Sequence, residues 1–278
     1  MHILDGIKTS KKVERELKKE LGRLKSKIKL AVILVGNNPA SIIYVNKKKE
    51  KCKELGIECK LIKLNENLAQ DDLDLVIDKL NNDKSVTGIL VQLPLPKNID
   101  TREILDRVSI KKDVDGLKSY HLIKILLNEE KIIPCTPQGI LLLLNEYNIS
   151  LEGKNVCIIG FSDVVGKPLA TLCLNRGATV TVCHKKTKKL NEHTLSADII
   201  MTATGIPKLI KADMVKEGAI VIDIGISKVN GKTVGDVDFD NVKDKCSYIT
   251  PVPGGVGPMT IISLIHNLIL LKKLQSDL

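Results

Sequence analysis

Short apolar runs, most of them rich in β-branched residues, recur along this chain and constrain its fold more than any other feature. They are LAVILV (30–35), CKLIKL (59–64), VTGILV (86–91), VCIIGF (156–161), TVTVC (179–183), DIIMTA (198–203) and AIVIDIG (219–225). Near-continuous apolar runs of this length are typical of parallel strands that are buried on both faces. Helical patterns lie between them, so the sequence predicts an α/β fold with parallel sheets.

The predicted helices carry recognisable start and stop signals. One begins with Asn38 as its N-cap and Pro39 at its first helical position, and it stops at Gly56. Further helices are predicted over about 9–24, 70–82, 137–147 and 166–176. A long apolar helix, MTIISLIHNLILLKKL (259–274), follows a loop rich in glycine and proline.

The strands form two groups, one before about residue 93 and one after about residue 156. We therefore expect two α/β domains with a cleft between them. The first comprises residues 1–118 and the C-terminal helix 259–278, and the second, residues 119–258, is a Rossmann-type dinucleotide-binding domain. The second sheet is expected to be complete by Gly225, which leaves the last helix to pack on the first domain.

Composition excludes several classes of protein. No apolar run approaches the ~20 residues that cross a bilayer. The start, MHILDGIKTSKK, lacks the apolar core of a signal peptide, so we expect a cytoplasmic protein without membrane contact. The seven cysteines are scattered without a CxxC pair, which argues against disulfides or a zinc site and for reduced thiols in the core.

The net charge of +10 favours an anionic partner, unless the lysines only solvate the surface. Two Phe, four Tyr and no Trp supply few stacking platforms for nucleic acid. A phosphorylated cofactor or a polycarboxylate substrate therefore suits the charge better.

The segment VCIIGFSDVVGKPL predicts a phosphate-binding turn between a strand and a helix. Gly160, Ser162 and Gly166 form a G-x-S-x-x-x-G pattern there. Small residues at these positions let the backbone approach a pyrophosphate at the helix N-terminus. The pattern alone is weak, but its strand–turn–helix–strand context favours a dinucleotide site.

The following strand ends in Cys183-His184-Lys185-Lys186 instead of the carboxylate that holds the ribose of NAD. Its two lysines either meet a 2′-phosphate, which favours NADP over NAD, or form a solvated turn. Two later strand ends, TATG and DIGIS, offer Gly205 and the Gly225–Ile226 backbone as cofactor contacts or as plain turns.

The segment ASIIYVNKKKEKC (40–52) combines a tyrosine with a lysine cluster. At 100° per residue, one helical stripe carries Tyr44, Lys48, Cys52 and Leu55, with Ser41 at its edge. The other lysines of the cluster point elsewhere. A partly desolvated lysine favours its neutral form and can act as a base, whereas the structural alternative is a lysine at a helix edge.

Three further segments place polar or flexible residues at strand ends. In GILVQLPLP, Gln92 follows a buried strand and either faces a ligand or caps its own loop. In KDVDGL, Asp113 and Asp115 precede a glycine turn, and either is explained equally well as a turn residue. The loop TPVPGGVGPMT (250–260) suits wrapping around a ligand or linking domains.

Together these motifs resemble the bifunctional methylenetetrahydrofolate dehydrogenase/cyclohydrolase family. The matching segments run in the family's order from about residue 36 to 262; they are NNPASIIYVNKKKEKCKELGI, GILVQLPLP, KDVDGL, PCTPQGI, GFSDVVGKPL, GATVTVCHKKT, GAIVIDIGIS, GDVDF and TPVPGGVGPMT. The resemblance implies oxidation of 5,10-methylenetetrahydrofolate with NADP to the methenyl cation, and then hydrolysis to 10-formyltetrahydrofolate. It also implies a homodimer, a folate substrate with or without a polyglutamate tail, a place in the one-carbon metabolism that serves purine biosynthesis, and no metal.

The resemblance assigns roles residue by residue. Lys48 is implied to be the key residue of hydrolysis, Gln92 to tune it, Tyr44 to line the folate and Asp115 to bind the pterin ring. The remaining implied substrate contacts are Val91, Leu93, Pro253, Gly254, Gly255, Val256, Gly257 and Pro258. The implied cofactor contacts are Gly160, Phe161, Ser162, Gly166, Lys185, Gly205 and Ile226.

The chain departs from the family pattern at the cofactor. Many relatives carry Arg or Ala at the position of Phe161 and Ser at the position of Lys185. Loss of the arginine removes one partner of a 2′-phosphate, while Lys185 supplies another. NADP is therefore expected, with NAD and a monofunctional dehydrogenase as the alternative.

Overall fold

The computed structural model describes residues 1–24 and 27–276, which form two compact units. The six-stranded unit comprises Met1–Val13 and Thr136–Ile262, and the three-stranded unit comprises Glu14–Cys135 and Ser263–Leu278. Both units are α/β, as the alternating patterns predict. The chain passes between them within α1 (Gly6–Arg23), at the start of α6 (Cys135–Glu146) and within α10 (Val256–Ser276).

The division between units differs from the expected domain boundaries in three places. Residues 119–135 group with the three-stranded unit, and residues 259–262 and 1–13 group with the six-stranded unit. The N-terminus belongs there because β1 (His2–Ile3) pairs in parallel with β11 (Cys246–Ile249). The expectation that the second sheet is complete by Gly225 is wrong, since β11 adds to β8 and β1 adds to β11.

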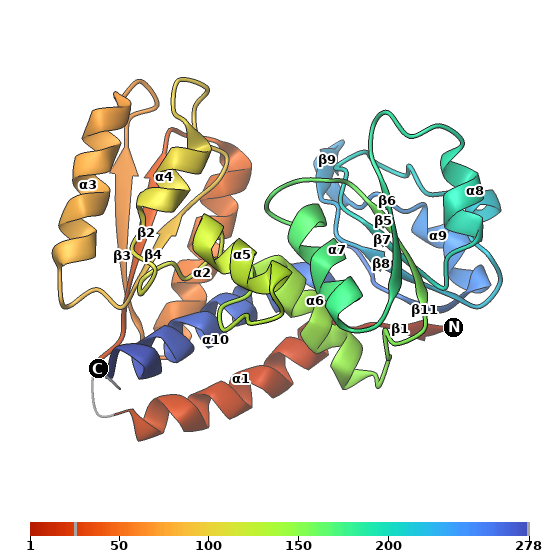
Figure 1. Ribbon diagram of the computed structural model, residues 1–278, viewed down its shortest axis with the longest axis horizontal. Coiled ribbons are helices and arrows are strands. Elements are labelled where there is room, and N and C mark those ends of the chain that lie inside the picture. The colour runs from red at the N-terminus through yellow and green to blue at the C-terminus, as the bar shows by residue number, and fades with distance from the viewer. Residues whose placement is uncertain (25–26, 277–278) are drawn as a thin grey trace. The chain divides into compact units, whose positions relative to one another are not determined.

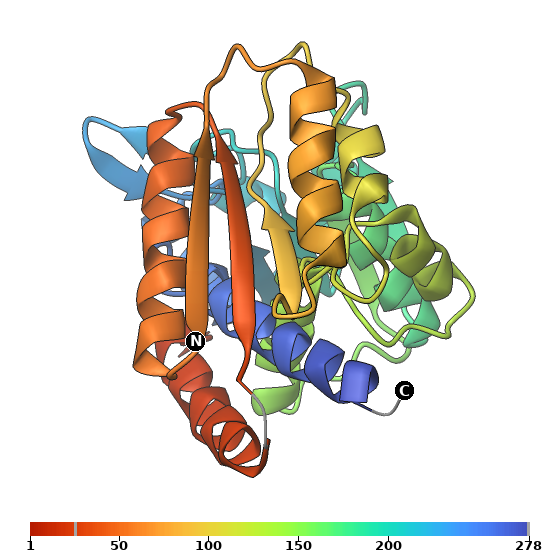
Figure 2. The ribbon, with the colours of Figure 1, turned by 90° about the vertical axis from the view of Figure 1, so that its left-hand side faces the viewer.

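The three-stranded sheet has the order β3 (Glu58–Leu64), β2 (Lys29–Val35), β4 (Gly88–Val91), with all neighbours parallel. The central strand β2 is buried from Leu30 to Val35, which accounts for its unbroken apolar run. Figures 1 and 2 show α2 (Pro39–Glu54) and α3 (Gln70–Asn82) flanking these strands. Two shorter helices, α4 (Thr101–Arg107) and α5 (Ser119–Leu126), complete the unit.

The start of α2 follows the predicted capping chemistry. The side chain of Asn38 accepts hydrogen bonds from the backbone N–H groups of Ala40, at 3.0 Å, and Ser41, at 3.1 Å. Pro39 occupies the first helical position, where its missing N–H costs nothing. The helix ends at Glu54, and Gly56 follows with a φ of +69°. Both predicted helix signals are confirmed.

The six-stranded sheet has the order β1-β11-β8-β7-β5-β6, and every pair of neighbours is parallel. Its other strands are β5 (Asn155–Ile159), β6 (Thr179–Cys183), β7 (Ile199–Thr202) and β8 (Ala219–Asp223). The chain runs outward from β5 to β6 and then returns to β7 on the other side of β5. This reversal creates a topological switch point, where open α/β sheets bind ligands beyond the carboxyl ends of their strands.

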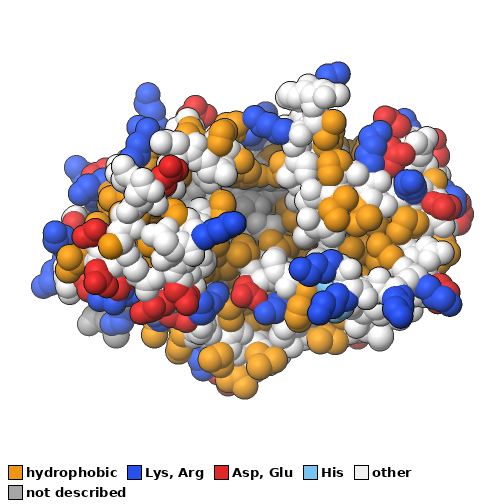
Figure 3. All heavy atoms as spheres, turned by 90° about the horizontal axis from the view of Figure 1, so that it is seen from above, with side chains coloured by type: hydrophobic (Ala, Val, Ile, Leu, Met, Phe, Trp, Pro, Cys, Tyr) orange, Lys and Arg blue, Asp and Glu red, His pale blue; other side chains and the backbone are white. Residues whose placement is uncertain are grey.

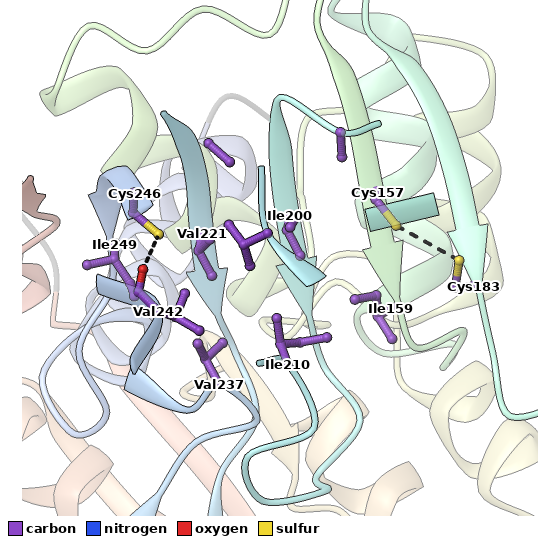
Figure 4. Close-up of a cluster of buried hydrophobic side chains, with 13 residues drawn as sticks. Cys157, Ile159, Cys183, Ile200, Ile210, Val221, Val237, Val242, Cys246 and Ile249 are labelled. Carbon is purple, nitrogen blue, oxygen red and sulfur yellow. Dashed lines mark hydrogen bonds between the residues drawn. The ribbon is translucent and has the colours of Figure 1, made fainter. Parts of the chain in front are cut away.

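Further elements belong to the six-stranded unit besides α6. They include the helices α7 (Gly166–Asn175), α8 (Leu190–Leu195) and α9 (Phe239–Val242), and the antiparallel hairpin of β9 (Ser227–Val229) with β10 (Lys232–Val234). Figure 4 shows one core cluster, in which isoleucine and valine side chains from β5, β7, β8 and β11 pack with cysteines. All seven cysteines are free thiols, and six are buried, which confirms their predicted use as core residues.

None of the helices within residues 1–24 and 27–276 has the length and apolar character that spanning a membrane would need. On the face shown in Figure 3, lysine and arginine side chains are interspersed with acidic and apolar ones. The positive charge of the chain is therefore distributed over this face.

Candidate active site

The lysine cluster of α2 contains one buried member. Lys48 is 7% exposed, whereas Lys47 and Lys49 are exposed and Lys51 pairs with Glu14 at 2.8 Å. The predicted separation of Lys48 from its neighbours is confirmed. The stripe itself differs in detail, because its buried residues are Ser41, Val45, Lys48 and Cys52. Tyr44 is half-buried beside it, and burial raises the pKa of its phenol.

Lys48 meets Gln92 where β4 ends. The Lys48 Nζ donates a hydrogen bond to Gln92 Oε1 at 3.1 Å. Gln92 is held in place by its own backbone N–H, which donates to Ile33 O at 2.9 Å, and by its Nε2, which donates to Leu93 O at 2.7 Å. The amide is thus oriented with its oxygen toward the lysine. Val91 is buried and Leu93 is half-buried at the same strand end.

The two aspartates of KDVDGL have different roles. Asp113 is buried and caps the turn, because its carboxylate accepts from Gly116 N at 3.1 Å and Lys118 N at 2.8 Å. Burial raises the pKa of Asp113 to about 7, with a smaller contribution from the charge of Asp115. Asp115 is half-buried, and its charge acts on the thiol of Cys135. The turn role therefore belongs to Asp113.

Cys135 lies close to both charged residues of this site. Burial raises the pKa of its thiol well above the ordinary value, the charge of Asp115 raises it further and the charge of Lys48 lowers it. The thiol also donates to Val114 O at 3.5 Å. Lys48 and Gln92 are in contact, and Asp115 and Cys135 belong to the same three-stranded unit.

Asn267, on α10, supports the Asp115 segment and was not predicted. Its Nδ2 donates to Val114 O at 3.0 Å and to Ile133 O at 2.9 Å. A Cβ on Gly116 would lie 2.9 Å from the backbone of Ile133 and Pro134, so the turn after Asp115 packs directly on that segment. A carboxamide within the largely apolar run of α10 is the signal that could have indicated a buried partner.

The predicted phosphate-binding turn follows β5, which ends at Ile159 and not at Phe161. Gly160 has a φ of +115°, and a Cβ there would lie 2.5 Å from Ala203 O. A Cβ on Gly166 would lie 2.1 Å from Gly160 O. Ser162 Oγ accepts from Val165 N at 3.2 Å, which orders the entry to α7. Two glycines thus make possible the close approach of strand, loop and helix that a dinucleotide cradle requires.

The lysine-rich end of β6 lies next to this turn, because Gly160 N donates to Cys183 O at 2.9 Å. Lys185 is exposed in a turn that is closed by a hydrogen bond of 2.9 Å from His184 N to Thr187 Oγ1. Phe161 is also exposed, with the Lys167 ammonium 5.1 Å from the centre of its ring.

The ends of β7 and β8 complete the same edge of the sheet. Gly205 has a φ of +71°, and a Cβ there would meet no atom within 4 Å. Ile226 is an exposed apolar side chain. Ser227 Oγ donates to Gly205 O at 2.8 Å, so the two strand-end segments are joined. The structure therefore brings the predicted cofactor residues of β5, β6, β7 and β8 together at one edge of the six-stranded unit.

The glycine-rich segment 250–258 comprises the connection from β11 to α10 and the first residues of α10, and it lies in the six-stranded unit. Gly255 N donates to Pro251 O at 2.8 Å, and Ile7 N donates to Gly254 O at 3.1 Å. A Cβ on Gly6 would lie 1.8 Å from Gly255 O, so the start of α1 packs directly on the loop. Pro253 is exposed, Gly254, Gly257 and Pro258 are half-buried, and Gly255 and Val256 are buried.

Two family models match this chain in succession. The catalytic domain of tetrahydrofolate dehydrogenase/cyclohydrolase matches residues 4–115, and the NAD(P)-binding domain of the same family matches residues 134–276. The chain belongs to the tetrahydrofolate dehydrogenase/cyclohydrolase family. The family that the motifs resemble is thereby confirmed.

Relatives of this tetrahydrofolate dehydrogenase/cyclohydrolase chain match it over nearly its whole length. The bifunctional protein FolD of Hydrogenobaculum sp. is 52% identical over 269 residues, which cover 96% of this chain and 97% of the relative. The crystal structure of the bifunctional enzyme FolD from Campylobacter jejuni has 50% identity and a TM-score of 0.96, with 99% of both chains covered. The Trypanosoma brucei enzyme, solved with an NADP cofactor and an inhibitor, has 34% identity and a TM-score of 0.94 over 99% of this chain and 98% of its own.

Proposed function

We propose that this chain oxidises 5,10-methylenetetrahydrofolate to 5,10-methenyltetrahydrofolate with NADP and then hydrolyses the product to 10-formyltetrahydrofolate. The observation that carries the proposal is the buried Lys48 with its Nζ bonded to Gln92 Oε1 at 3.1 Å. A dehydrogenase alone does not need a buried amine at this place. The relatives named as bifunctional over nearly the whole chain support both activities.

Hydrolysis needs a base close to a positively charged substrate. We propose that the Lys48 amine acts as this base and accepts a proton from the water that attacks the methenyl cation. Gln92 Oε1 accepts one N–H of the lysine and so fixes the direction of the nitrogen. Asp115, which we propose binds the pterin ring, adds negative charge that favours the cation. Tyr44, half-buried one turn before Lys48, lines the folate.

The residues of the six-stranded unit fit a dinucleotide. Gly160 and Gly166 lack the Cβ atoms that would close the cradle, and the N-terminus of α7 favours an anionic pyrophosphate. When bound, NADP supplies the acceptor for the hydride. Lys185, exposed at the end of β6, provides a positive charge for the 2′-phosphate, and Gly205 and Ile226 leave an open edge beside it. Phe161 and Ser162 are proposed to line the same cradle.

The remaining parts of the proposal rest on family membership. We propose that Val91, Leu93 and the loop residues Pro253, Gly254, Gly255, Val256, Gly257 and Pro258 contact the folate. We also propose that the enzyme is a cytoplasmic homodimer and that its product serves purine biosynthesis. Residues 1–118 with 259–278 and residues 119–258 are proposed as the folate and cofactor domains, allowing for the different division into compact units.

A coupled assay tests the function directly. Purified protein is mixed with 5,10-methylenetetrahydrofolate and either NADP or NAD, and methenyltetrahydrofolate is followed by its absorbance. A second assay starts from methenyltetrahydrofolate and follows its loss. We expect both activities, with NADP preferred. Oxidation without hydrolysis would establish a monofunctional dehydrogenase, and absence of both would overturn the proposal.

A further inference from the structure

Two buried aspartates lie near the carboxyl ends of the six-stranded sheet, and the mechanism above uses neither. Asp223 is the last residue of β8, and Asp236 follows β10 in the motif GDVDF. Asp236 is 0% exposed and Asp223 is 3% exposed. Burial of two carboxylates is costly unless hydrogen bonds compensate for it, so their partners indicate what they hold in place.

Asp236 fixes the segment that follows β7. Its Oδ2 accepts from Thr202 Oγ1 at 2.9 Å, from Thr204 N at 2.6 Å and from Thr204 Oγ1 at 2.9 Å. Thr204 Oγ1 in turn accepts from Ile206 N at 3.1 Å. These bonds set the path of the backbone on both sides of Gly205, the open glycine of the cofactor edge.

Asp223 fixes the segments on either side of the hairpin β9–β10. Its Oδ1 accepts from Gly225 N at 3.2 Å and from Asp236 N at 3.0 Å. Its Oδ2 accepts from Val237 N at 3.0 Å. The backbone N–H of Asp223 donates to Thr250 Oγ1 at 2.7 Å, so the start of the loop 250–258 is tied to the same point.

Each aspartate occupies space that a glycine leaves open. A Cβ on Gly225 would lie 1.9 Å from Asp236 Oδ1, and a Cβ on Gly235 would lie 1.9 Å from Asp223 Oδ2. Neither glycine has the positive φ that would require glycine for its backbone conformation. Both positions therefore require glycine because there is no room for a Cβ, and not because of the backbone conformation. Asp236 fills the space beside Gly225, and Asp223 fills the space beside Gly235.

We propose that Asp236 and Asp223 are positioning residues for the cofactor, which hold the strand-end segments around Gly205 and Ile226 in the conformation that binds the dinucleotide. The inference rests on the proposed function, because these segments were assigned to the cofactor there. Ser227 Oγ, which donates to Gly205 O at 2.8 Å, joins the two segments that the aspartates fix. Burial raises the pKa of Asp223 to about 7, while its hydrogen bonds from the backbone of Asp236, Val237 and Gly225 lower it.

The bifunctional chemistry supplies an internal control, because hydrolysis of methenyltetrahydrofolate does not consume the dinucleotide. For Asp236→Ala we expect the KM for NADP to rise by about tenfold or more, since a carboxylate with three donors is lost. Hydrolysis is expected to stay within about twofold of the wild type, because Lys48 and Gln92 are untouched. Asp236→Asn keeps an acceptor oxygen and should recover part of the NADP affinity. Asp240→Ala, at an exposed aspartate of α9, is the matched control and should change neither activity.

Two milder variants keep the test decisive where Asp236→Ala fails to fold. Thr204→Val removes one donor to Asp236 and should raise the KM for NADP by about fivefold. Gly225→Ala should imitate Asp236→Ala by displacing the carboxylate. An unchanged KM for NADP in Thr204→Val and Gly225→Ala, or an equal fall of both activities, would overturn the inference. If the wild type itself oxidises no methylenetetrahydrofolate, the proposed function fails instead, so the two failures are distinct.

Discussion

The Nζ of Lys48 lies 3.1 Å from Oε1 of Gln92, at the junction of α2 with the carboxyl end of β4. This partner is a neutral carbonyl oxygen, so it orients the amine without forming an ion pair. In the same unit, Asp115 lies on a turn that is held by hydrogen bonds to the side chain of Asp113 and from the side chain of Asn267. We propose that the site combines the oriented amine with this carboxylate.

Replacement of the buried lysine should abolish hydrolysis. Lys48→Met keeps the length of the side chain but removes the base, so we expect the rate of methenyl hydrolysis to fall by about 10² to 10⁴-fold. Lys47→Met, one residue away on the exposed side of α2, is the control and should leave hydrolysis unchanged. Normal hydrolysis by Lys48→Met would refute the role.

Conversion of the neutral partner to a charged one should slow hydrolysis. Gln92→Glu places a carboxylate beside Lys48 in nearly the same volume. Because an ion pair with this carboxylate would hold the amine away from the attacking water, the rate of methenyl hydrolysis should fall by about tenfold or more. An unchanged rate would show that Gln92 does not act through the lysine.

Loss of the Asn267 carboxamide should loosen the turn that carries Asp115. Asn267→Leu leaves the carbonyl of Ile133 without its amide donor and that of Val114 with only the weak thiol donor of Cys135, which should lower the free energy of unfolding by about 2–3 kcal/mol. The KM for the folate should rise while the KM for NADP stays constant. Denaturant unfolding and initial rates check both effects, with Ser276→Ala, at the exposed end of α10, as the control.

The stability of the protein should depend on the protonation of Asp223. Burial raises its pKa to about 7 in the folded state, and the charge of Asp236 contributes to this rise. Between about pH 4 and 7 the folded protein therefore holds a proton that the unfolded chain has released, so stability falls as pH rises through this range. The contribution is at most about 1.4 kcal/mol per pH unit.

Asp223→Asn should reduce the slope of the free energy of unfolding against pH, whatever its effect on stability at a single pH. Urea unfolding of the variant and the wild type at several pH values between 4.5 and 8 measures the difference. A residual slope of the same sign is expected from Asp113, whose pKa burial also raises to about 7. Equal slopes in the two proteins would contradict the assignment.

The charge at the end of β6 should set the choice of cofactor. Lys185→Glu reverses the charge that we assign to the 2′-phosphate, so the preference for NADP over NAD should fall by about tenfold or more. Initial rates with each nucleotide at equal concentration measure the preference. Lys188→Glu, at another exposed lysine of the same segment, is the control.

Periodicity and capping chemistry predicted the local elements of this fold well. Helical phase singled out Lys48 from its neighbours because a difference of one residue turns a side chain by 100°, which decides burial. Asn38 and Pro39 fixed the start of α2 for equally local reasons. Motif context placed Gly160 and Gly166 at the end of a strand, where the structure also has them.

Contacts between residues that are far apart in the sequence could not be predicted from such local patterns. Asn267 meets Val114 across 153 positions of the chain, and Asp236 meets Thr202 across 34. Nothing in the sequence near either residue encodes its partner, since both depend on how separate elements pack. The two-residue strand β1 was missed for the same reason, because its pairing with β11 leaves no local pattern.

The pairing of Ile3 with Ile249 affects how the chain can fold during synthesis. Strand β1 forms one edge of the sheet, but its partner β11 is synthesised much later. At translation rates of about 5–20 residues per second, this delay is roughly 12 to 50 seconds. The three-stranded unit waits even longer, because Ser263–Leu278 belongs to it. Neither unit can be completed until these late segments have been synthesised, so a ribosome that stalls before them would hold a chain in which neither unit is complete.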